Sequence, residues 1–273
     1  MSKIFLYFPQ WQGSGKTNEI YTGASFLKSE LGNEVQFTEI NQPQTEDLET
    51  EHNVIGYQRI LKNLESAKAI LTDTRPDVIF TLGGDCGIEV CPVTYLNERY
   101  KSDLLVLWFD AHGDLNTPKS SPSKTFHGMP LRMILGDGDL ALMQNCFSVL
   151  SPNQIVLVGT RDLDQPEQQY VQDNSISLIE PKNLSLEKLN NIIEEKGKKN
   201  IYVHLDLDVI DPNELLDVKC PTANGISFDQ VQQMLAHLKK NYNVVGGSIV
   251  EYVPKKSDVD PRILELTKSI FLR

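Results

Sequence analysis

The chain has 273 residues, a formal net charge of −11 and 40% hydrophobic residues. This length and apolar content allow one large α/β domain, or two small ones, with a sizeable core. The negative charge argues against nucleic acid or an anionic membrane as a partner, and it is compatible with an enzyme that attracts cationic substrates.

The sequence has no apolar run of membrane-spanning length, and the N-terminus lacks a signal-peptide pattern. Cys86, Cys91, Cys146 and Cys220 are irregularly spaced and do not form a disulfide framework in a chain of this size. We therefore expect a cytoplasmic protein in a reducing compartment, without a membrane or nucleic-acid partner.

Strands and helices are expected to alternate along the chain. Strands are predicted at residues 3–8, 35–40, 77–82, 104–109, 154–159, 175–179, 201–206 and 244–250. Helices are predicted at residues 18–30, 54–72, 88–100, 165–172, 185–196, 227–241 and 261–271. Because no repeat, low-complexity segment or linker is visible, we predict a single domain over residues 1–273, with a doubly wound, mostly parallel sheet.

The loop after the first strand contains Gly13-Ser14-Gly15-Lys16-Thr17, which suggests a phosphate-binding loop. That motif requires a glycine at position 10, where this chain has Gln10. A polar loop that leads into the first helix is therefore the better interpretation.

The strand predicted at 104–109 is followed by an acidic, alternating segment. Asp110, His112 and Asp114 occupy every second position, and a period of two places their side chains on one face, directed at the same point. Two carboxylates and an imidazole suit hard or borderline divalent metals. The alternative is a strand that ends in a polar turn, with Asp110 or Asp114 capping the next element.

A second strand has the same kind of ending, with Asp206 and Asp208 in the segment Asp-Leu-Asp-Val-Ile-Asp-Pro. Open α/β sheets build their sites from residues at the carboxyl ends of strands. The paired glycines of Gly83-Gly84-Asp85-Cys86-Gly87 also allow a tight turn and a close backbone approach after the strand at 77–82. These segments together favour a binuclear metal centre.

The segments Gly-Gly-Asp-Cys-Gly, Asp-Ala-His-Gly-Asp-Leu-Asn-Thr-Pro and Asp-Leu-Asp-Val-Ile-Asp-Pro, in this order, resemble the arginase (ureohydrolase) family over about residues 77–254. The resemblance implies a three-layer α/β/α fold and two Mn²⁺ ions with a bridging hydroxide. It also implies hydrolysis of L-arginine to ornithine and urea, and a homo-oligomer, either a trimer or a hexamer.

The resemblance also implies a set of metal ligands. Asp110 and Asp206 would contact both metals, Asp114 the first, and His112 and Asp208 the second. The family normally has His at the position of Cys86, as a ligand of the first metal. A thiolate disfavours Mn²⁺ relative to Zn²⁺ or Fe²⁺, so the first site would be weak, empty or occupied by another divalent ion.

The resemblance implies further roles in catalysis and substrate binding. Asp114 would orient the hydroxide and pass its proton to the leaving amine, and His127 would be a proton shuttle, unless it is a buried structural His. Glu251 would pair with the substrate guanidinium.

The substrate carboxylate would be bound by Asn116, Ser123 and Thr125, the last of which stands where the family usually has Asn. Asp164 would contact the α-amino group directly, and Glu167 through water, although both also suit the first turn of a helix. Contacts to carboxylate, amine and guanidinium favour L-arginine over agmatine. The alternatives are a related guanidino or formimino substrate, as in agmatinase or formimidoylglutamase, and a non-catalytic protein.

Two further residues leave alternatives open. Cys220 stands where the family has a substrate-contacting Thr, so Cys86 and Cys220 form either a redox-sensitive pair or two small buried side chains. His204 precedes Asp206 by one strand period; it would be either a substitute metal ligand or, as we expect, a hydrogen-bonded core residue.

Overall fold

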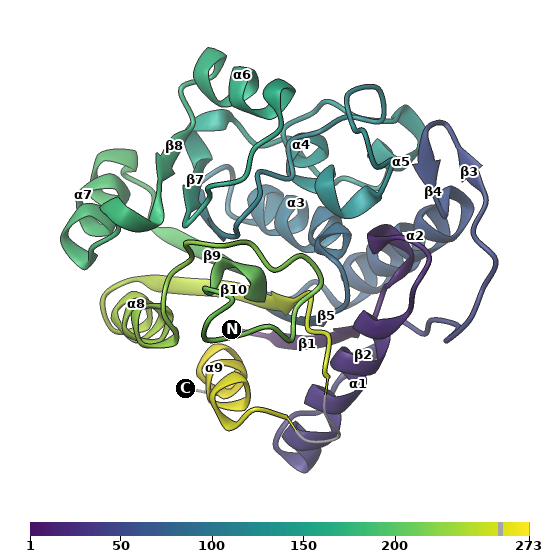
Figure 1. Cartoon of the computed structure of the whole chain (residues 1–273), viewed down its shortest axis with the longest axis horizontal. Coiled ribbons are helices and arrows are strands. Elements are labelled where there is room, and N and C mark those ends of the chain that lie inside the picture. The colour runs from purple at the N-terminus through teal and green to yellow at the C-terminus, as the bar shows by residue number, and fades with distance from the viewer. Residues whose placement is uncertain (256–258, 273) are drawn as a thin grey trace.

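The computed structural model describes residues 1–255 and 259–272. Its main sheet has eight strands in the order β2-β1-β5-β10-β9-β6-β7-β8 (Figure 1), and each neighbouring pair is parallel. The strands are β1 (Lys3–Phe8), β2 (Thr38–Glu39), β5 (Val78–Gly83), β6 (Leu104–Phe109), β7 (Ile155–Val158), β8 (Ser177–Ile179), β9 (Asn200–Asp206) and β10 (Asn243–Val250). A separate antiparallel pair consists of β3 (Thr50–Glu51) and β4 (Val54–Ile55).

The central strands are apolar on both faces because helices cover both sides of the sheet. In β6, Leu105, Leu107 and Phe109 pack in one hydrophobic core. Leu104, Val106 and Trp108 alternate with them and pack in the other. This explains why the strand is a continuous apolar run rather than an alternation of apolar and polar residues.

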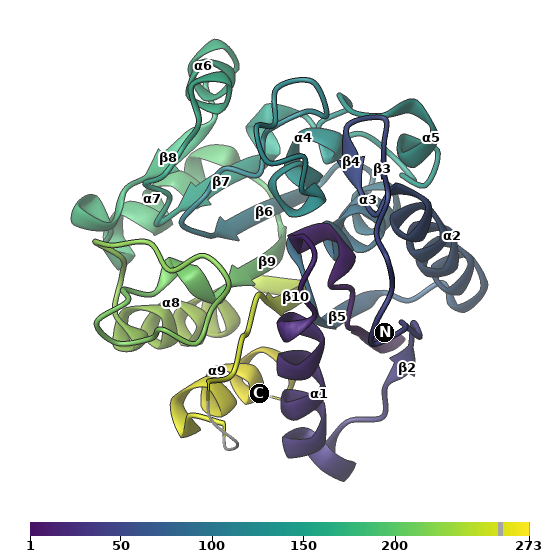
Figure 2. The same ribbon diagram turned by 45° about the vertical axis from the view of Figure 1, so that its right-hand side comes forward.

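Each core is closed by its own layer of helices. One layer contains α1 (Glu19–Leu31), α7 (Leu186–Lys196), α8 (Phe228–Asn241) and α9 (Pro261–Phe271). The other contains α2 (Tyr57–Thr74), α3 (Val90–Arg99), α4 (Pro130–Ile134) and α5 (Leu140–Met143), with α6 (Gln165–Asp173) packing at its border. Figures 1 and 2 show α8 and α9 on the side of the sheet opposite α2 and α3. The predicted three-layer, doubly wound parallel fold is confirmed.

Short 3₁₀ turns connect many of these elements. They are η1 (Gln12–Ser14), η2 (Gly32–Glu34), η3 (Cys86–Glu89), η4 (Phe126–Gly128), η5 (Pro152–Gln154), η6 (Pro181–Asn183) and η7 (Leu207–Val209). Across residues 1–255 and 259–272, the structure has no helix with the length and apolar character needed to cross a membrane.

Several predicted boundaries differ from the structure. The strand predicted at 35–40 is reduced to Thr38–Glu39, because β2 lies at the edge of the sheet and pairs with β1 through only those two residues. The helix predicted to begin at residue 54 begins at Tyr57, because Val54–Ile55 pairs with β3 and Gly56 turns the chain with a φ of 72°. The helix predicted to begin at residue 88 begins at Val90, because the preceding residues form η3.

The strand register brings distant segments to one edge of the sheet. Val250 in β10 lies opposite Asp206 in β9, and Leu205 in β9 lies opposite Phe109 in β6. The residues that follow these strands therefore meet at the carboxyl edge, where open α/β sheets bind their ligands.

Candidate active site

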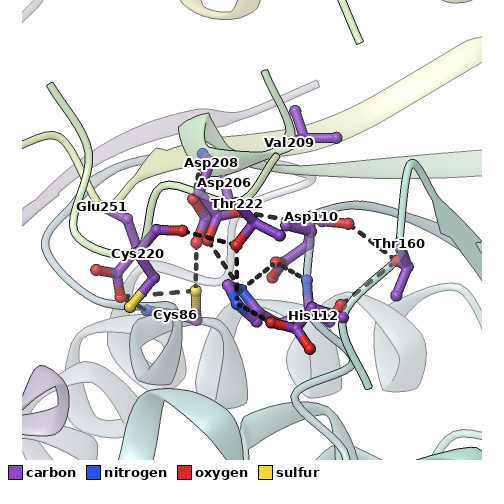
Figure 3. A network of polar contacts seen from close by, with 12 residues as sticks. Cys86, Asp110, His112, Thr160, Asp206, Asp208, Val209, Cys220, Thr222 and Glu251 are labelled. Atoms are coloured by element: carbon purple, nitrogen blue, oxygen red, sulfur yellow. Dashed lines mark hydrogen bonds and ion pairs between the residues drawn. The ribbon is translucent and has the colours of Figure 1, made fainter. Parts of the chain in front are cut away.

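One pocket lies at this carboxyl edge and has a volume of about 140 Å³. Every site residue predicted from the sequence lines it except Asp110, which is fully buried next to it. The lining residues are Cys86, His112, Asp114, Asn116, Ser121, Ser123, Thr125, His127, Gly128, Asp164, Glu167, Asp206, Asp208, Cys220 and Glu251. Figure 3 shows part of this set, with Glu251, Cys86 and Cys220 on one side and His112 and Asp110 on the other.

The predicted ligands of the second metal form a compact group. His112 Nδ1 lies 2.9 Å from an Asp208 carboxylate oxygen and 3.5 Å from Asp110 Oδ1. Donor atoms of the three residues all lie within 4.8 Å of one another. The structure therefore brings two carboxylates and an imidazole together, whereas Asp206, which the resemblance also implies as a ligand of the second metal, belongs to another donor group.

Cys86 belongs to two further donor groups. Cys86 Sγ lies 3.1 Å from Asp206 Oδ2, and Cys86, Asp206 and Glu251 form one group. A second group joins Cys86 to Asp110, Asp114 and His204. The imidazole of His204, expected to be a core residue, thus lies among the potential ligands of the first metal.

The convergence of these side chains depends on turns more than on strand alternation. β6 ends at Phe109, so Asp110 is the first residue beyond it. Asp208 lies in η7 rather than in a continuing strand, and its side chain accepts a hydrogen bond from the Ala111 backbone N–H. The prediction that a period of two aligns Asp110, His112 and Asp114 on a strand is therefore wrong in its mechanism, although their side chains do converge.

Asp114 and Glu251 share an unusual backbone conformation. Their φ angles are 52° and 62°, in the left-handed region that non-glycine residues seldom adopt and that costs about 1–3 kcal/mol. Within the described part of the chain, Asp114 Oδ2 and Glu251 Oε2 are buried without a hydrogen-bond partner. Buried carboxylate oxygens of this kind are suited to a cation.

The electrostatics of the donor groups also fit metal ions. Burial and the neighbouring carboxylates raise the pKa of Asp114 and of Asp206 well above the usual value, and burial and Asp110 raise the pKa of Asp208 to about 6. Burial lowers the pKa of His112, but Asp110 and Asp208 together raise it by more, so the net shift is upward. Divalent cations would offset this concentration of negative charge, and the donors, oxygen and nitrogen with one thiol, suit Mn²⁺, Fe²⁺ or Zn²⁺. The residues present therefore fit a pair of divalent ions.

Glu251 also connects the metal ligands to His127. Its Oε1 atom lies 3.1 Å from His127 Nδ1 and accepts a hydrogen bond of 3.3 Å from the Cys86 backbone N–H. Burial lowers the pKa of His127, but Glu251 raises it by more. His127 is half-buried and lines the pocket, which suits a group that moves protons between the pocket and solvent.

The predicted substrate contacts form the outer wall of the pocket. Asn116 Nδ2 donates a hydrogen bond of 2.9 Å to Asp164 Oδ2. The hydroxyls of Ser123 and Thr125 share a hydrogen bond of 2.6 Å. The four side chains already pair with one another, so a substrate would have to share or replace these hydrogen bonds.

Glu167 has a clear structural function. Its two carboxylate oxygens accept hydrogen bonds from the Leu115 and Asp164 backbone N–H groups, at 2.9 and 2.8 Å, and it completes a capping box at the start of α6. Burial raises the pKa of Glu167 to about 7, although these N–H groups oppose the shift. The sequence left open whether Glu167 stabilises the first turn of a helix, and the structure places it there.

Sequence reasoning missed two residues that hold the site together. Arg161, in the loop after β7, donates hydrogen bonds to five backbone carbonyls, those of Gly159, Asp208, Val209, Thr222 and Ala223. Asp85 accepts hydrogen bonds of 2.9 Å from Gln10 Nε2 and from the Gly13 and Gly87 backbone N–H groups. The start of the loop expected to be a polar lead into α1 is thus buried and tied to the site. Asp85 lies within the segment Gly83-Gly84-Asp85-Cys86-Gly87, but the sequence around Asp85 and Arg161 does not indicate which groups they bond.

Comparisons with known proteins identify the family of this chain. The sequence model described as "Arginase family" matches residues 18–268. The arginase of Staphylococcus aureus (strain COL) is 35% identical over 180 residues, which cover 63% of this chain and only 59% of that protein. The arginase of Entamoeba histolytica is 31% identical over 228 residues, covering 78% of this chain and 77% of that protein.

Solved structures of proteins with similar folds include an arginase and a formimidoylglutamase. The crystal structure of Entamoeba histolytica arginase in complex with L-ornithine has a TM-score of 0.89 at 25% identity, and the alignment covers 100% of this chain and 99% of that one. Formimidoylglutamase from Bacillus subtilis, with a TM-score of 0.73 at 17% identity over 99% of this chain and 84% of that one, shares the fold. The chain therefore belongs to the arginase family.

Proposed function

We propose that the protein is a hydrolase that converts L-arginine to ornithine and urea with the help of two divalent metal ions. One observation carries this proposal: most of the metal donors, polar side chains and a Glu251 carboxylate oxygen without a hydrogen-bond partner in the described residues all lie at one pocket. Each part of arginine then has a group of suitable chemistry.

The metals would be held by the side chains already described. Cys86, Asp110, Asp114 and Asp206 would bind the first ion, and Asp110, His112, Asp206 and Asp208 the second. When bound, such a pair supplies a nucleophile from water at neutral pH and polarises the substrate. We expect Mn²⁺, with Zn²⁺ or Fe²⁺ as alternatives in the first site because of the Cys86 thiol.

The protein groups would orient the substrate and move protons. Glu251 would pair with the guanidinium through its free Oε2 atom and so position the carbon that is attacked. Asp114, through its unpartnered Oδ2, would take the proton of the nucleophile and deliver it to the leaving amine. His127, in contact with Glu251, would carry the remaining proton between the pocket and solvent.

The outer wall would recognise the amino-acid end of the substrate. Asn116, Ser123 and Thr125 offer amide and hydroxyl donors for the α-carboxylate, and Asp164 offers a carboxylate for the α-ammonium. Agmatine has no α-carboxylate, so these residues would favour arginine. Glu167 would support the α-ammonium through water and by holding the Asp164 backbone N–H.

A related guanidino or formimino compound is the second candidate substrate. The observation that favours it is the pairing of Asn116 with Asp164 and of Ser123 with Thr125, which leaves fewer free donors for an α-carboxylate. The structural similarity to a formimidoylglutamase, and to a putative agmatinase from Clostridium difficile with a TM-score of 0.70, is compatible with this candidate but shows the fold alone.

The test is urea release from L-arginine by the purified protein after incubation with Mn²⁺, with chelator-treated protein as the blank. Metal-dependent urea release supports the arginase proposal. Release of urea from agmatine, or of formamide from a formimino amino acid, with none from arginine would favour the second candidate. Arginine binding with no turnover of arginine, agmatine or a formimino amino acid in the presence of each of Mn²⁺, Zn²⁺ and Fe²⁺ would contradict both.

A further inference from the structure

His204 lies in β9, one strand period before Asp206, and is fully buried. Its Nε2 atom is 3.7 Å from Asp110 Oδ2 and has no hydrogen-bond partner in residues 1–255 and 259–272. A buried polar atom without a partner destabilises the folded protein, so this ring nitrogen calls for an explanation.

The other side of the ring is held in place. His204 Nδ1 shares a hydrogen bond of 3.3 Å with Ser248 Oγ. It also lies 3.2 Å from Glu89 Oε1, an ion-pair distance, and neither Glu89 carboxylate oxygen has a hydrogen-bond partner in the described residues. The ring stacks on Trp108 with 3.7 Å between centroids and 22° between planes. Trp108 Nε1 in turn donates a hydrogen bond to Asp110 Oδ2. The imidazole is thus fixed with Nδ1 facing Glu89 and Nε2 facing Asp110.

This arrangement places a buried carboxylate beside the ring nitrogen that faces away from the donor groups, as in many metal-binding histidines. A ligating imidazole usually donates its other N–H group to a carboxylate, which sets the tautomer and the orientation of the ring. Glu89 is fully buried and ends η3, the same turn that begins with Cys86. A donor atom of His204 lies within 4.8 Å of donor atoms of Cys86, Asp110 and Asp114.

We propose that His204 is a ligand of the first metal, oriented by Glu89, and that it supplies the imidazole that the family resemblance implies at position 86. This inference rests on the two-metal site of the proposed function and specifies its first half. The first ion would then have nitrogen and thiol donors together with carboxylates. Such a set shifts preference from Mn²⁺ toward Zn²⁺ or Fe²⁺ in this half of the site. The competing role is a protonated core imidazole that neutralises Asp110 and Glu89 and never contacts a metal.

The first test is metal content and affinity of His204→Ala, measured with Zn²⁺ by competition with a chromophoric chelator. We expect two tightly bound ions per wild-type chain, and one ion in the variant with the second reduced at least about tenfold in affinity. The matched control is His237→Ala, because His237 lies in α8, contacts Asn190 and belongs to none of the donor groups of the described residues. Wild-type stoichiometry and affinity in His204→Ala would overturn the proposal.

A second pair of variants guards against a folding defect in His204→Ala. Glu89→Gln keeps the size of the side chain and removes its charge, and it should weaken one of the two ions about tenfold to a hundredfold. The double variant Cys86→His with His204→Ala should regain the second ion, because it places an imidazole at the other position in the same donor group. An unchanged affinity in Glu89→Gln, or no gain in the double variant while circular dichroism shows a folded protein, would contradict the proposal.

A crystal structure of the wild-type protein with Zn²⁺ gives the direct test. We expect anomalous density about 2.0–2.1 Å from His204 Nε2, a zinc–nitrogen bond length. Two ions in the pocket, both beyond bonding distance of Nε2, would reject the role of His204 and leave the proposed hydrolase intact. A wild-type chain that binds no pair of ions would reject both.

Discussion

Glu251 Oε1 lies 3.1 Å from His127 Nδ1, although the two residues are 124 positions apart in the sequence. Glu251 follows β10 and His127 is the middle residue of η4, so the contact joins the centre of the sheet to the wall of the pocket. The same carboxylate keeps Oε2 without a hydrogen-bond partner in the described chain. One oxygen thus orients the proposed proton carrier, and the other is available to a cationic substrate.

Replacement of this carboxylate should reduce turnover while leaving the fold intact. Glu251→Gln keeps the shape and removes the charge that would face the guanidinium. Loss of one partner of a buried charge pair costs about 2–5 kcal/mol, so kcat/KM for L-arginine should fall at least about 30-fold. Glu180→Gln, at an exposed ion pair with Lys182, is the control and should be within twofold of wild type. Loss of a metal ion in Glu251→Gln would instead assign Glu251 to the metals.

Removal of the Arg161 guanidinium should destabilise the protein. Arg161→Lys cannot reach the five carbonyls that the guanidinium bonds, so several buried acceptors lose their donors. We expect the free energy of unfolding in urea to fall by about 2–4 kcal/mol, with weaker metal binding because the Asp208 backbone is released. The control is Arg75→Lys. The exposed Arg75 side chain has one hydrogen bond in the described residues, to the Thr72 carbonyl, so this variant should change the free energy of unfolding by less than about 0.5 kcal/mol. Equal effects of the two variants would contradict the bracing role.

Glu167 should make the stability of the metal-free protein depend on pH. Its pKa rises from 4.5 in the unfolded reference to about 7 in the folded protein. The folded state therefore binds this proton more tightly, so the resulting stability is present below pH 4.5 and is lost as the pH rises through 7. Glu167→Gln lacks this loss. In urea unfolding with a chelator, the advantage of wild type over Glu167→Gln should shrink by up to about 3 kcal/mol from pH 4.5 to pH 7.5. A constant or growing difference would contradict the shift.

A methyl group at Gly84 should disrupt the turn that carries Asp85 and Cys86. A Cβ atom there would lie 1.8 Å from the Gln10 carbonyl oxygen, a backbone atom that cannot rotate away. Gly84→Ala should lose at least about 3 kcal/mol of stability or fail to fold. Gly128→Ala is the matched control, because a Cβ there meets no atom within 4 Å although Gly128 lines the same pocket. Similar thermal unfolding of the two variants would rule out the close contact at Gly84.

The two cysteines of the pocket should react slowly with alkylating agents and mild peroxide. Burial and the surrounding carboxylates raise the pKa of Cys86 well above its usual value, and burial and Glu251 raise that of Cys220 to about 12. Thiolate is the reactive form, so neither side chain should be modified quickly by iodoacetamide at pH 7.5 in the metal-free protein. The urea-unfolded chain, in which all four cysteines should react, is the control by mass spectrometry. Rapid modification of Cys86 or Cys220 would revive the redox-sensor alternative.

Much of this molecule could be predicted from local patterns. The apolar runs that become β6 and β9 are long and buried on both faces, so their type and their carboxyl ends were evident. The rule that open sheets bind ligands at this edge then placed Asp110 and Asp206 together, whereas Glu251 was expected there only through the family resemblance. The family resemblance added the expected roles of these residues in metal and substrate binding, which stay predictions until they are measured.

The rest depends on contacts between distant segments. β2 is short because nothing pairs with its outer side in the described chain, and the sequence at 35–40 does not show which strand will lie at the edge. The partners of Arg161, and two of the three partners of Asp85, are backbone groups, which any sequence would offer. Glu89 is an acidic residue in an apolar stretch. It lies beside His204 because η3 and β9 are neighbours in the folded protein, and the sequence does not indicate that contact.

β10 lies between β5 and β9 in the sheet, yet it is the last strand of the described chain. During synthesis on the ribosome, β5 and β9 therefore emerge with their inner edges unpaired, and the sheet closes only after residue 250 has been made. Open apolar edges of this kind are prone to pair with other chains. Cys86, which follows β5, and Asp206, which ends β9, likewise reach their final distance only when β10 pairs between these two strands. Metal ions should thus bind only after β10 has been synthesised, and a nascent chain stopped before β10 should be prone to aggregation.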